Sequence, residues 1–224
     1  MMALELEGIS QTRGSGRRAV EALRDVSLSI AAGEFVLLEG PSGAGKTTLL
    51  AVAAGLLTPT AGTVKLAGQS IGALSSAECR RHRAACVGFV FQRSNLLPQL
   101  TLWDNVLLMA AIGGVPRTEG EGEATRLLEA LGLAGLTHRR PRELSGGEEQ
   151  RAAVARALVH RPAIVLADEP TGNLDSVSGR AVAERLAGLA AERGTAVLVA
   201  THDPRLEPFA TRRVRIADGA IAAG

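Results

Sequence analysis

The chain of 224 residues contains no tyrosine, and only 2% of its residues are aromatic. Its two cysteines, Cys79 and Cys86, have no cluster of further metal-binding side chains beside them in the sequence. We therefore expect two free thiols in a reducing compartment rather than a disulfide or a zinc site. Lysine is scarce as well, because the only lysines are Lys46 and Lys65 and the remaining Lys/Arg cations are arginines.

Long apolar runs and a strong charge imbalance are also missing. No stretch of eighteen or more apolar residues occurs, and the start MMALELEG lacks the basic-then-apolar pattern of a secretory signal, so we expect a cytoplasmic protein. A formal net charge of +2 gives no electrostatic reason to expect nucleic acid as a partner. The hydrophobic content of 46% is ample for a packed core.

Strand-like and helix-like patterns alternate along the chain. An antiparallel β flank is expected from the short β-like runs at 4–9, 25–30 and 62–68. Three continuous apolar runs, typical of buried strands, lie at 34–40, 162–169 and 195–202, and two helical patterns lie at 46–57 and 177–193. Their alternation predicts a mostly parallel sheet with intervening helices. The tail RRVRIADGAIAAG predicts a final hairpin around Asp218-Gly219.

In the segment from about 93 to 160 the pattern changes, because its apolar residues recur at helical spacing. We interpret it as a helical subdomain inserted between the early and late strands. The predicted fold class is therefore α/β, with a mostly parallel sheet, an antiparallel β flank and an inserted helical part. We expect one domain over 1–224, in which 1–92 and 161–224 form the core.

The segment GPSGAGKTT matches the phosphate-loop pattern GxxxxGK[ST], and it follows a predicted strand and precedes a predicted helix. Its backbone N–H groups are expected to surround phosphate oxygens. Lys46 is expected to reach the β- and γ-phosphates, and the Thr47 hydroxyl to bind Mg²⁺. The predicted nucleotide-binding residues of this loop are Gly40, Pro41, Ser42, Gly43, Ala44, Gly45, Lys46, Thr47 and Thr48.

Polar residues follow three other apolar runs, where the carboxyl ends of parallel strands would place them at one edge of the sheet. Asp168 is predicted to bind Mg²⁺, and Glu169 to accept a proton from an attacking water. Gln92 can bind Mg²⁺ or orient water, although such a glutamine is more often an ordinary surface residue. His202 can hydrogen-bond a γ-phosphate, with a capping or surface histidine as the alternative. The remaining histidines, expected to be solvated, are His82, His138 and His160.

The segment LSGGEEQ is a second glycine-rich stretch that opens a helix. Ser145, Gly146 and Gly147 form an expected anion site, because exposed N–H groups and the helix dipole favour a phosphate. The alternative is a simple N-cap, since Ser145 with Glu148 three positions later also fits a capping box.

Taken in order, GPSGAGKTT, Gln92, LSGGEEQ, IVLADEP, GNLD and His202 resemble the nucleotide-binding subunit of ABC transporters over essentially the whole chain. The resemblance implies a P-loop NTPase core that binds ATP and Mg²⁺. It also implies that two copies pack head to tail, so that LSGGEEQ (Ser145, Gly146 and Gly147) contacts the γ-phosphate of the partner's nucleotide. Asn173 to Asp175 would cross that interface, and Gln92 would sense nucleotide for a membrane partner.

The resemblance further implies a mechanism, in which Mg·ATP closes the homodimer and hydrolysis reopens it. Glu169 would activate water, while Lys46 and His202 would stabilise charge on the γ-phosphate. The phrases LADEPTGNLD and FQRSNLLP are most similar to the branch of macrolide exporters, lipoprotein-releasing ATPases and a cell-division ATPase. That branch implies an integral-membrane permease as partner and a peripheral position on the inner face of the membrane, for export, lipoprotein or lipid extraction, or mechanotransmission.

Alternatives of other classes stay open at this point. A soluble ABC-type ATP switch could act on nucleic acid or ribosomes, although such relatives usually carry long insertions or a second nucleotide domain. A metabolite kinase would explain the phosphate loop but not LSGGEEQ.

Two further residues carry hypotheses about binding. Family members usually stack an aromatic residue on adenine after the first strand, and here Arg13 falls near that place; its guanidinium can stack on a base or simply be exposed. The apolar stretch Leu96 to Ile112, which contains Trp103, is expected to supply core residues and part of a docking surface for the membrane subunit.

Overall fold

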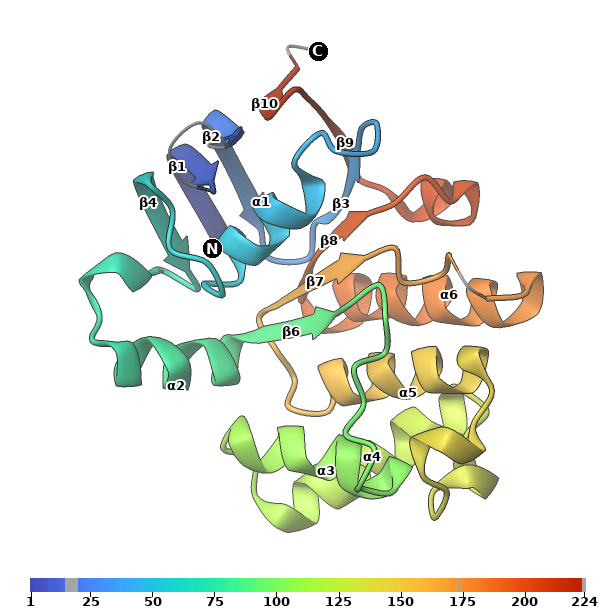
Figure 1. Cartoon of the computed structure of the whole chain (residues 1–224). Coiled ribbons are helices and arrows are strands. Elements are labelled where there is room, and N and C mark those ends of the chain that lie inside the picture. The colour runs from blue at the N-terminus through green and yellow to red at the C-terminus, as the bar shows by residue number, and fades with distance from the viewer. Residues whose placement is uncertain (15–19, 173, 223–224) are drawn as a thin grey trace.

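The computed structural model describes residues 1–14, 20–172 and 174–222, and in it two β-sheets and a set of helices are layered around two apolar cores (Figure 1). The strands are β1 Met2–Arg13, β2 Val20–Ala31, β3 Phe35–Glu39, β4 Ala61–Leu66, β5 Gln69–Ser70, β6 Val87–Val90, β7 Ile164–Asp168, β8 Ala196–Ala200, β9 Arg212–Ala217 and β10 Ala220–Ile221. The α-helices are α1 Lys46–Ala53, α2 Ser76–Cys86, α3 Leu102–Ile112, α4 Arg117–Ala130, α5 Gly146–Leu158 and α6 Ser176–Arg193. Short 3₁₀ turns are η2 Ile71–Ala73, η3 Ala134–Leu136, η4 Pro141–Glu143 and η5 Pro204–Phe209.

The larger sheet has the strand order β10-β9-β3-β8-β7-β6, in which all pairs except β10 with β9 are parallel. Every residue of β7 and β8 is buried, which is why both strands are continuous apolar runs without alternation. Because β3, β8, β7 and β6 are consecutive neighbours, the segments that follow them emerge side by side at one edge of the sheet. This edge is where the sequence places its polar candidates.

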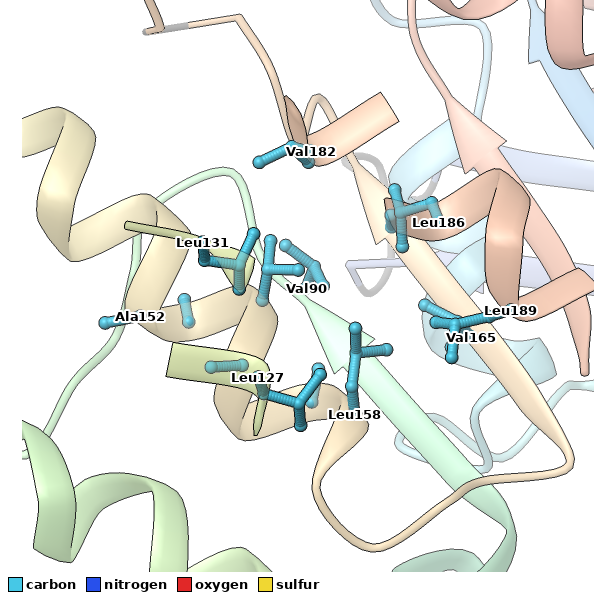
Figure 2. Close-up of a cluster of buried hydrophobic side chains, with 14 of the residues drawn as sticks. Val90, Leu127, Leu131, Ala152, Leu158, Val165, Val182, Leu186 and Leu189 are labelled. Carbon is cyan, nitrogen blue, oxygen red and sulfur yellow. The ribbon is translucent and has the colours of Figure 1, made fainter. Parts of the chain in front are cut away.

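The smaller sheet is antiparallel, with the order β2-β1-β4-β5, and α1 packs between the two sheets (Figure 1). One apolar core therefore joins the small sheet, α1 and one face of the large sheet. The opposite face of the large sheet packs against α5 and α6, and α4 packs on α5 beyond them. Figure 2 shows side chains of this second core, from Val90 of β6 to Leu127 of α4 and Leu186 of α6.

These observations confirm the predicted fold class, including the antiparallel flank, the mostly parallel sheet and the final hairpin β9–β10. The range 93–160 contains α3, α4 and α5 and no strand, as a helical insertion requires. Its boundaries as a separate subdomain, and those of the 1–92 and 161–224 core, stay a prediction. No helix within the described residues is both long enough and apolar enough to cross a membrane.

The helix α2 was not expected from the sequence. None of its residues is buried, so its sequence SAECRRHRAAC carries no apolar stripe that would reveal a helix. The overlooked signal is local: Ser75 and Glu78 form a reciprocal capping box at its start.

One expectation about the histidines is wrong. His160 is only 5% exposed, because it follows α5 where that helix packs on β6, and its Nε2 meets the carbonyl oxygen of Val87 at 3.1 Å. Burial holds the pKa of His160 below its ordinary value. His138 is exposed as expected, whereas His82 is half-buried with Nε2 at 2.8 Å from the Leu66 carbonyl oxygen. Both cysteines are free thiols, as predicted.

Candidate nucleotide-binding site

The phosphate loop runs from the end of β3 into α1, and close packing requires glycine at two of its positions, Gly40 and Gly45. At Gly45, which caps α1 with φ of 105°, a Cβ would lie 2.6 Å from the carbonyl oxygen of Ala22. At Gly40 a Cβ would lie 2.2 Å from the carbonyl oxygen of Ile216. No side chain fits at either place, so glycine allows the loop to lie between β2 and β9 with the helix N-terminus free for an anion.

A cleft of about 920 Å³ opens in front of this loop, and it gathers most of the residues singled out from the sequence. The predicted residues that line it are Gly40, Pro41, Ser42, Gly43, Gly45, Lys46, Thr47, Thr48, Arg13, Gln92, Asp168, Glu169 and His202. Ala44 is buried beneath the loop, where its carbonyl oxygen accepts a hydrogen bond from Gly219 N at 3.1 Å. Segments that follow β3, β8, β7 and β6 thus meet at one site, as the strand order of the large sheet requires, and the end of β1 reaches it from the smaller sheet.

Lys46 is folded back onto its own loop. Its Nζ donates to the carbonyl oxygens of Gly40 at 2.5 Å and Pro41 at 2.9 Å. The ammonium group is therefore held at the phosphate loop, where an incoming phosphate would replace these carbonyl partners.

Thr47 and Asp168 form the oxygen pair at the base of the cleft. The Thr47 hydroxyl donates to Asp168 Oδ2 at 2.8 Å, and Asp168 is only 7% exposed. Burial raises the pKa of Asp168 above its ordinary value, and the charge of Glu169 raises it further, against the hydrogen bond from Thr47. A carboxylate in this position would gain from a cation.

The Glu169 carboxylate is held by the segment that follows β8. Thr201 donates its hydroxyl to Oε2 at 2.9 Å, and Nδ1 of His202 donates to Oε1 at 2.7 Å. The backbone of Glu169 has φ of 46°, which is uncommon for a non-glycine residue, and its N–H bonds the Ala200 carbonyl oxygen at 2.8 Å. The strained backbone directs the carboxylate into the cleft, and the hydrogen bonds from Thr201 and His202 hold it there.

Gln92 is exposed and lines the cleft just beyond β6. The segment around it is tied to α5 through side-chain contacts with backbone carbonyls. Gln150 donates to the Phe91 carbonyl at 3.1 Å, and Arg156 donates to the carbonyls of Asn95 at 2.6 Å and Ser94 at 2.8 Å. The residues on both sides of Gln92 are therefore hydrogen-bonded to the helix that LSGGEEQ opens.

LSGGEEQ itself lies outside the cleft of this copy, since Ser145, Gly146 and Gly147 are not among the residues that line it. Ser145 caps α5: its hydroxyl accepts from Glu148 N at 3.3 Å, and its own N–H and hydroxyl donate to the Glu148 carboxylate. The capping-box alternative is thus present, and it leaves the N–H groups of Gly146 and Gly147 at an exposed helix start.

Asp175 is likewise outside the cleft and caps α6 by accepting from Val177 N at 3.0 Å and Ser178 N at 2.9 Å. Asn173 falls outside the described residues. Sequence reasoning overlooked Thr201, although the stretch ATH at the end of β8 offered a hydroxyl beside His202 at the same edge of the sheet.

The protein-family model described as ABC transporter matches residues 23–172 of the chain. The chain is 41% identical over 220 residues to the lipoprotein-releasing system ATP-binding protein LolD of Geobacter metallireducens, covering 98% of both chains. It is 43% identical over 221 residues to the macrolide export ATP-binding/permease protein MacB of Rhodopirellula baltica, covering 98% of this chain and 32% of that protein.

Solved structures agree with these relatives. The dimeric structure of MJ0796, a bacterial ABC transporter cassette, superposes with a TM-score of 0.92 at 37% identity, covering 98% of this chain and 97% of that one. A dimeric post-hydrolysis state of MJ0796 bound to ADP and Pi superposes with the same TM-score of 0.92 at 36% identity.

Proposed function

The chain belongs to the ABC transporter family as a subunit that binds and hydrolyses ATP, and we propose that it does so as a head-to-tail dimer that moves a membrane partner. The observation that carries this proposal is the meeting of the phosphate loop, Asp168, Glu169 and His202 in one cleft. The signature segment, which we define as LSGGEEQ, lies outside that cleft.

Mg²⁺ fits the oxygen pair at the base of the cleft. Thr47 and Asp168 present a hydroxyl and a partly desolvated carboxylate 2.8 Å apart, and oxygen ligands of this kind suit a hard cation. Among the described residues no group of three or more His, Cys, Asp or Glu side chains could hold a metal by itself, and Mg²⁺ usually takes only one or two protein ligands beside substrate phosphates. The ion would neutralise phosphate charge, with Gln92 as a further oxygen ligand from the cleft wall.

The side chains of the cleft have separate tasks in hydrolysis. Lys46 exchanges its carbonyl partners for phosphate oxygens and offsets their charge. Glu169, fixed by Thr201 and His202, is placed to accept a proton from water that attacks the γ-phosphate. His202 is 88% exposed, and with a proton on both ring nitrogens it can donate to Glu169 and to a phosphate oxygen at the same time.

The site is completed by a second copy of the chain. In a two-fold dimer the signature segment of one copy faces the cleft of the other, so Ser145 and the N–H groups of Gly146 and Gly147 meet the partner's γ-phosphate. The capping box supports this role in part, because its hydrogen bonds do not use the N–H groups of Gly146 and Gly147. The Ser145 hydroxyl would exchange its Glu148 partner for a phosphate oxygen. Asp175, at the start of α6, crosses the same interface.

The membrane partner is proposed to dock in an apolar groove of about 500 Å³ beside Gln92. Leu97, Leu108 and Ile112 line the groove although they are 43%, 38% and 53% exposed. Trp103 instead packs against the core, so the stretch Leu96 to Ile112 serves both purposes. The MacB relative supports a permease as the occupant, since its name joins an ATP-binding part to a permease and this chain matches 32% of it.

The names of the relatives suggest which class of cargo the transporter moves. Similarity to LolD and to MacB supports lipoprotein release or export, with the chain peripheral on the inner face of the membrane. The test is capture of the tagged chain from detergent-solubilised membranes, where a multi-spanning membrane protein is expected. Leu108→Glu should abolish capture and leave basal ATPase activity intact. ATPase activity stimulated by nucleic acid or ribosomes, without a membrane partner, would instead identify a soluble switch.

A further inference from the structure

We propose that Arg205 is a positioning residue for ATP hydrolysis, because it holds the backbone carbonyls of Thr171, Leu174 and Asp175, in the loop after β7, against the segment that carries His202. This inference rests on the proposed function, since the loop leads from Glu169 to Asp175 at the dimer interface. Arg205 does not line the nucleotide cleft, so it acts through the residues that it holds.

The guanidinium of Arg205 reaches three backbone carbonyls of that loop. Nη2 donates to the Thr171 carbonyl oxygen at 3.0 Å, and Nη1 donates to those of Asp175 at 2.9 Å and Leu174 at 3.5 Å. Nε donates to both carboxylate oxygens of Asp203 at 2.9 Å. One planar group thus binds both ends of the loop, and a lysine ammonium cannot reproduce this fork.

Asp203 connects this fork to the catalytic carboxylate. Its own carboxylate accepts from the Thr171 hydroxyl, and its N–H donates to the hydroxyl oxygen of Thr201 at 3.0 Å. Thr201 in turn donates to Glu169. Arg205 is therefore linked to the expected proton acceptor through the side chain and the backbone N–H of Asp203 and through the Thr201 hydroxyl.

The network is enclosed and stays charged. The side chain of Asp203 is 8% exposed and that of Arg205 is 29% exposed. Burial alone would raise the pKa of Asp203, but the hydrogen bonds from Arg205 and Thr171 outweigh it and lower this pKa to about 2. Removing the arginine would leave a buried carboxylate and three carbonyls with fewer donors.

Gly179 provides room for the guanidinium. A Cβ at this position of α6 would lie 2.1 Å from Arg205 Nη1 and 2.5 Å from Cζ. The obstructing atoms are the far end of a flexible side chain, so alanine at 179 would displace the guanidinium without requiring the backbone to move. Gly179→Ala therefore removes the contacts between the Arg205 guanidinium and the loop carbonyls, although Arg205 is still present.

The chain offers a matched control for each substitution. Arg180 lies next to Gly179, but its side chain is 77% exposed and pairs with Glu184. Gly188 belongs to the same helix, and a Cβ there would meet its nearest neighbour, Glu192 Oε1, at an ordinary 3.6 Å. Arg180→Ala and Gly188→Ala should keep the kinetics of the unmodified protein.

The experiment measures steady-state ATP hydrolysis and melting temperature for the six proteins, namely the unmodified chain, Arg205→Ala, Arg205→Lys, Gly179→Ala and the two controls. For Arg205→Ala and Gly179→Ala we expect kcat to fall by about 10- to 100-fold, since a small misplacement far from the chemistry can cost that much. KM for ATP should stay within about twofold, because the cleft is untouched. Arg205→Lys should resemble Arg205→Ala.

Three results would overturn the proposal: kcat of Arg205→Ala within about twofold of the unmodified chain, a loss confined to KM, or full recovery in Arg205→Lys. Wild-type kcat in Gly179→Ala beside an inactive Arg205→Ala would also overturn it. If Arg205→Ala fails to fold, Gly179→Ala decides the matter. An unmodified chain without ATPase activity would count against the proposed function, not against the positioning role of Arg205.

Discussion

The hydroxyl of Thr47 donates to the carboxylate of Asp168 at 2.8 Å, although 121 residues separate them in the chain. Thr47 lies in the first turn of α1 and Asp168 ends β7, and the contact exists because α1 packs across β7 and β8. This pair links the phosphate loop to the edge of the sheet that carries Asp168. Burial disfavours the negative charge of Asp168, whereas a bound metal ion would favour it.

Asp168→Asn is expected to stabilise the nucleotide-free protein at neutral pH and to abolish Mg²⁺-dependent hydrolysis. The pKa of Asp168 is raised in the folded state, so its ionisation weakens folding as pH rises from the unfolded pKa through the folded one, and the full cost is present above the folded pKa. Asparagine removes the charge and still accepts the Thr47 hydroxyl. Thermal melting checks this: a gain of about 1 kcal/mol would raise Tm by about 2–4 °C for a chain of this size.

Thr47→Ser is the conservative control for that experiment, since it keeps a hydroxyl beside Asp168. It should retain Mg²⁺-dependent hydrolysis and the wild-type melting temperature. A lower Tm for Asp168→Asn than for the unmodified protein would show that the buried charge stabilises the empty site.

A second prediction concerns Glu123, whose carboxylate on α4 is buried. It pairs with Arg161, which follows α5, at 3.1 Å, with Arg193 at the end of α6 at 2.9 Å, and with Arg126 of its own helix. Burial alone would raise the pKa of Glu123, but hydrogen bonds from Arg193 and Arg161 lower it below its ordinary value. A lowered folded pKa gives stability that is present above the unfolded value, near 4.5, and lost as pH falls through the folded pKa.

Glu123→Gln should therefore cost about 1–3 kcal/mol at pH 7, and its difference from the unmodified protein should shrink as pH falls below about 4.5. Urea unfolding of both proteins, at pH 7 and at a pH below about 4.5, measures this difference in the free energy of unfolding. Glu121→Gln on the same helix removes an exposed, solvent-screened pair with Arg117 and should cost much less than Glu123→Gln. Equal costs for the two substitutions would contradict the assigned role of the three arginines.

Arg13 carries a prediction about base selectivity. It lines the cleft from the end of β1, and a stacked guanidinium contributes about 0.5–2 kcal/mol with any purine. We expect ATP and GTP to bind with similar affinities and Arg13→Ala to weaken both, as measured by titration calorimetry. ATP binding much tighter than GTP binding, with the preference lost in Arg13→Ala, would show an adenine-specific contact instead.

The core strands and the cleft could be predicted because their signals are short and local. β7 and β8 are fully apolar runs, and Asp168, Glu169 and His202 follow them directly, so parallel order alone brings these side chains to one edge. The helix α2 could not be predicted from periodicity because it buries nothing. His160 was predicted to be solvated from its polar neighbours, but the packing of α5 on β6 decides its burial.

The contacts that set the geometry of the site were beyond sequence patterns. Thr201 and Arg205 act on residues more than thirty positions away, through hydrogen bonds that depend on strand order and on the space left at Gly179. No spacing rule relates such residues. A local motif therefore identifies which groups meet the nucleotide, while the fold determines which groups hold them.

The central claim is that each ATP is enclosed by two copies of the chain, and sedimentation of Glu169→Gln with Mg·ATP tests it most directly. Loss of the proton acceptor should slow hydrolysis by about 10²–10⁴-fold, so a closed dimer should accumulate. A Cβ at Gly146 would meet nothing within 4 Å, and an acidic residue suits a helix start, so adding Gly146→Asp leaves the monomer intact but places a negative charge at the partner's γ-phosphate. We predict a dimer for Glu169→Gln and a monomer for the double variant, whereas a monomeric Glu169→Gln at every protein concentration would contradict the account.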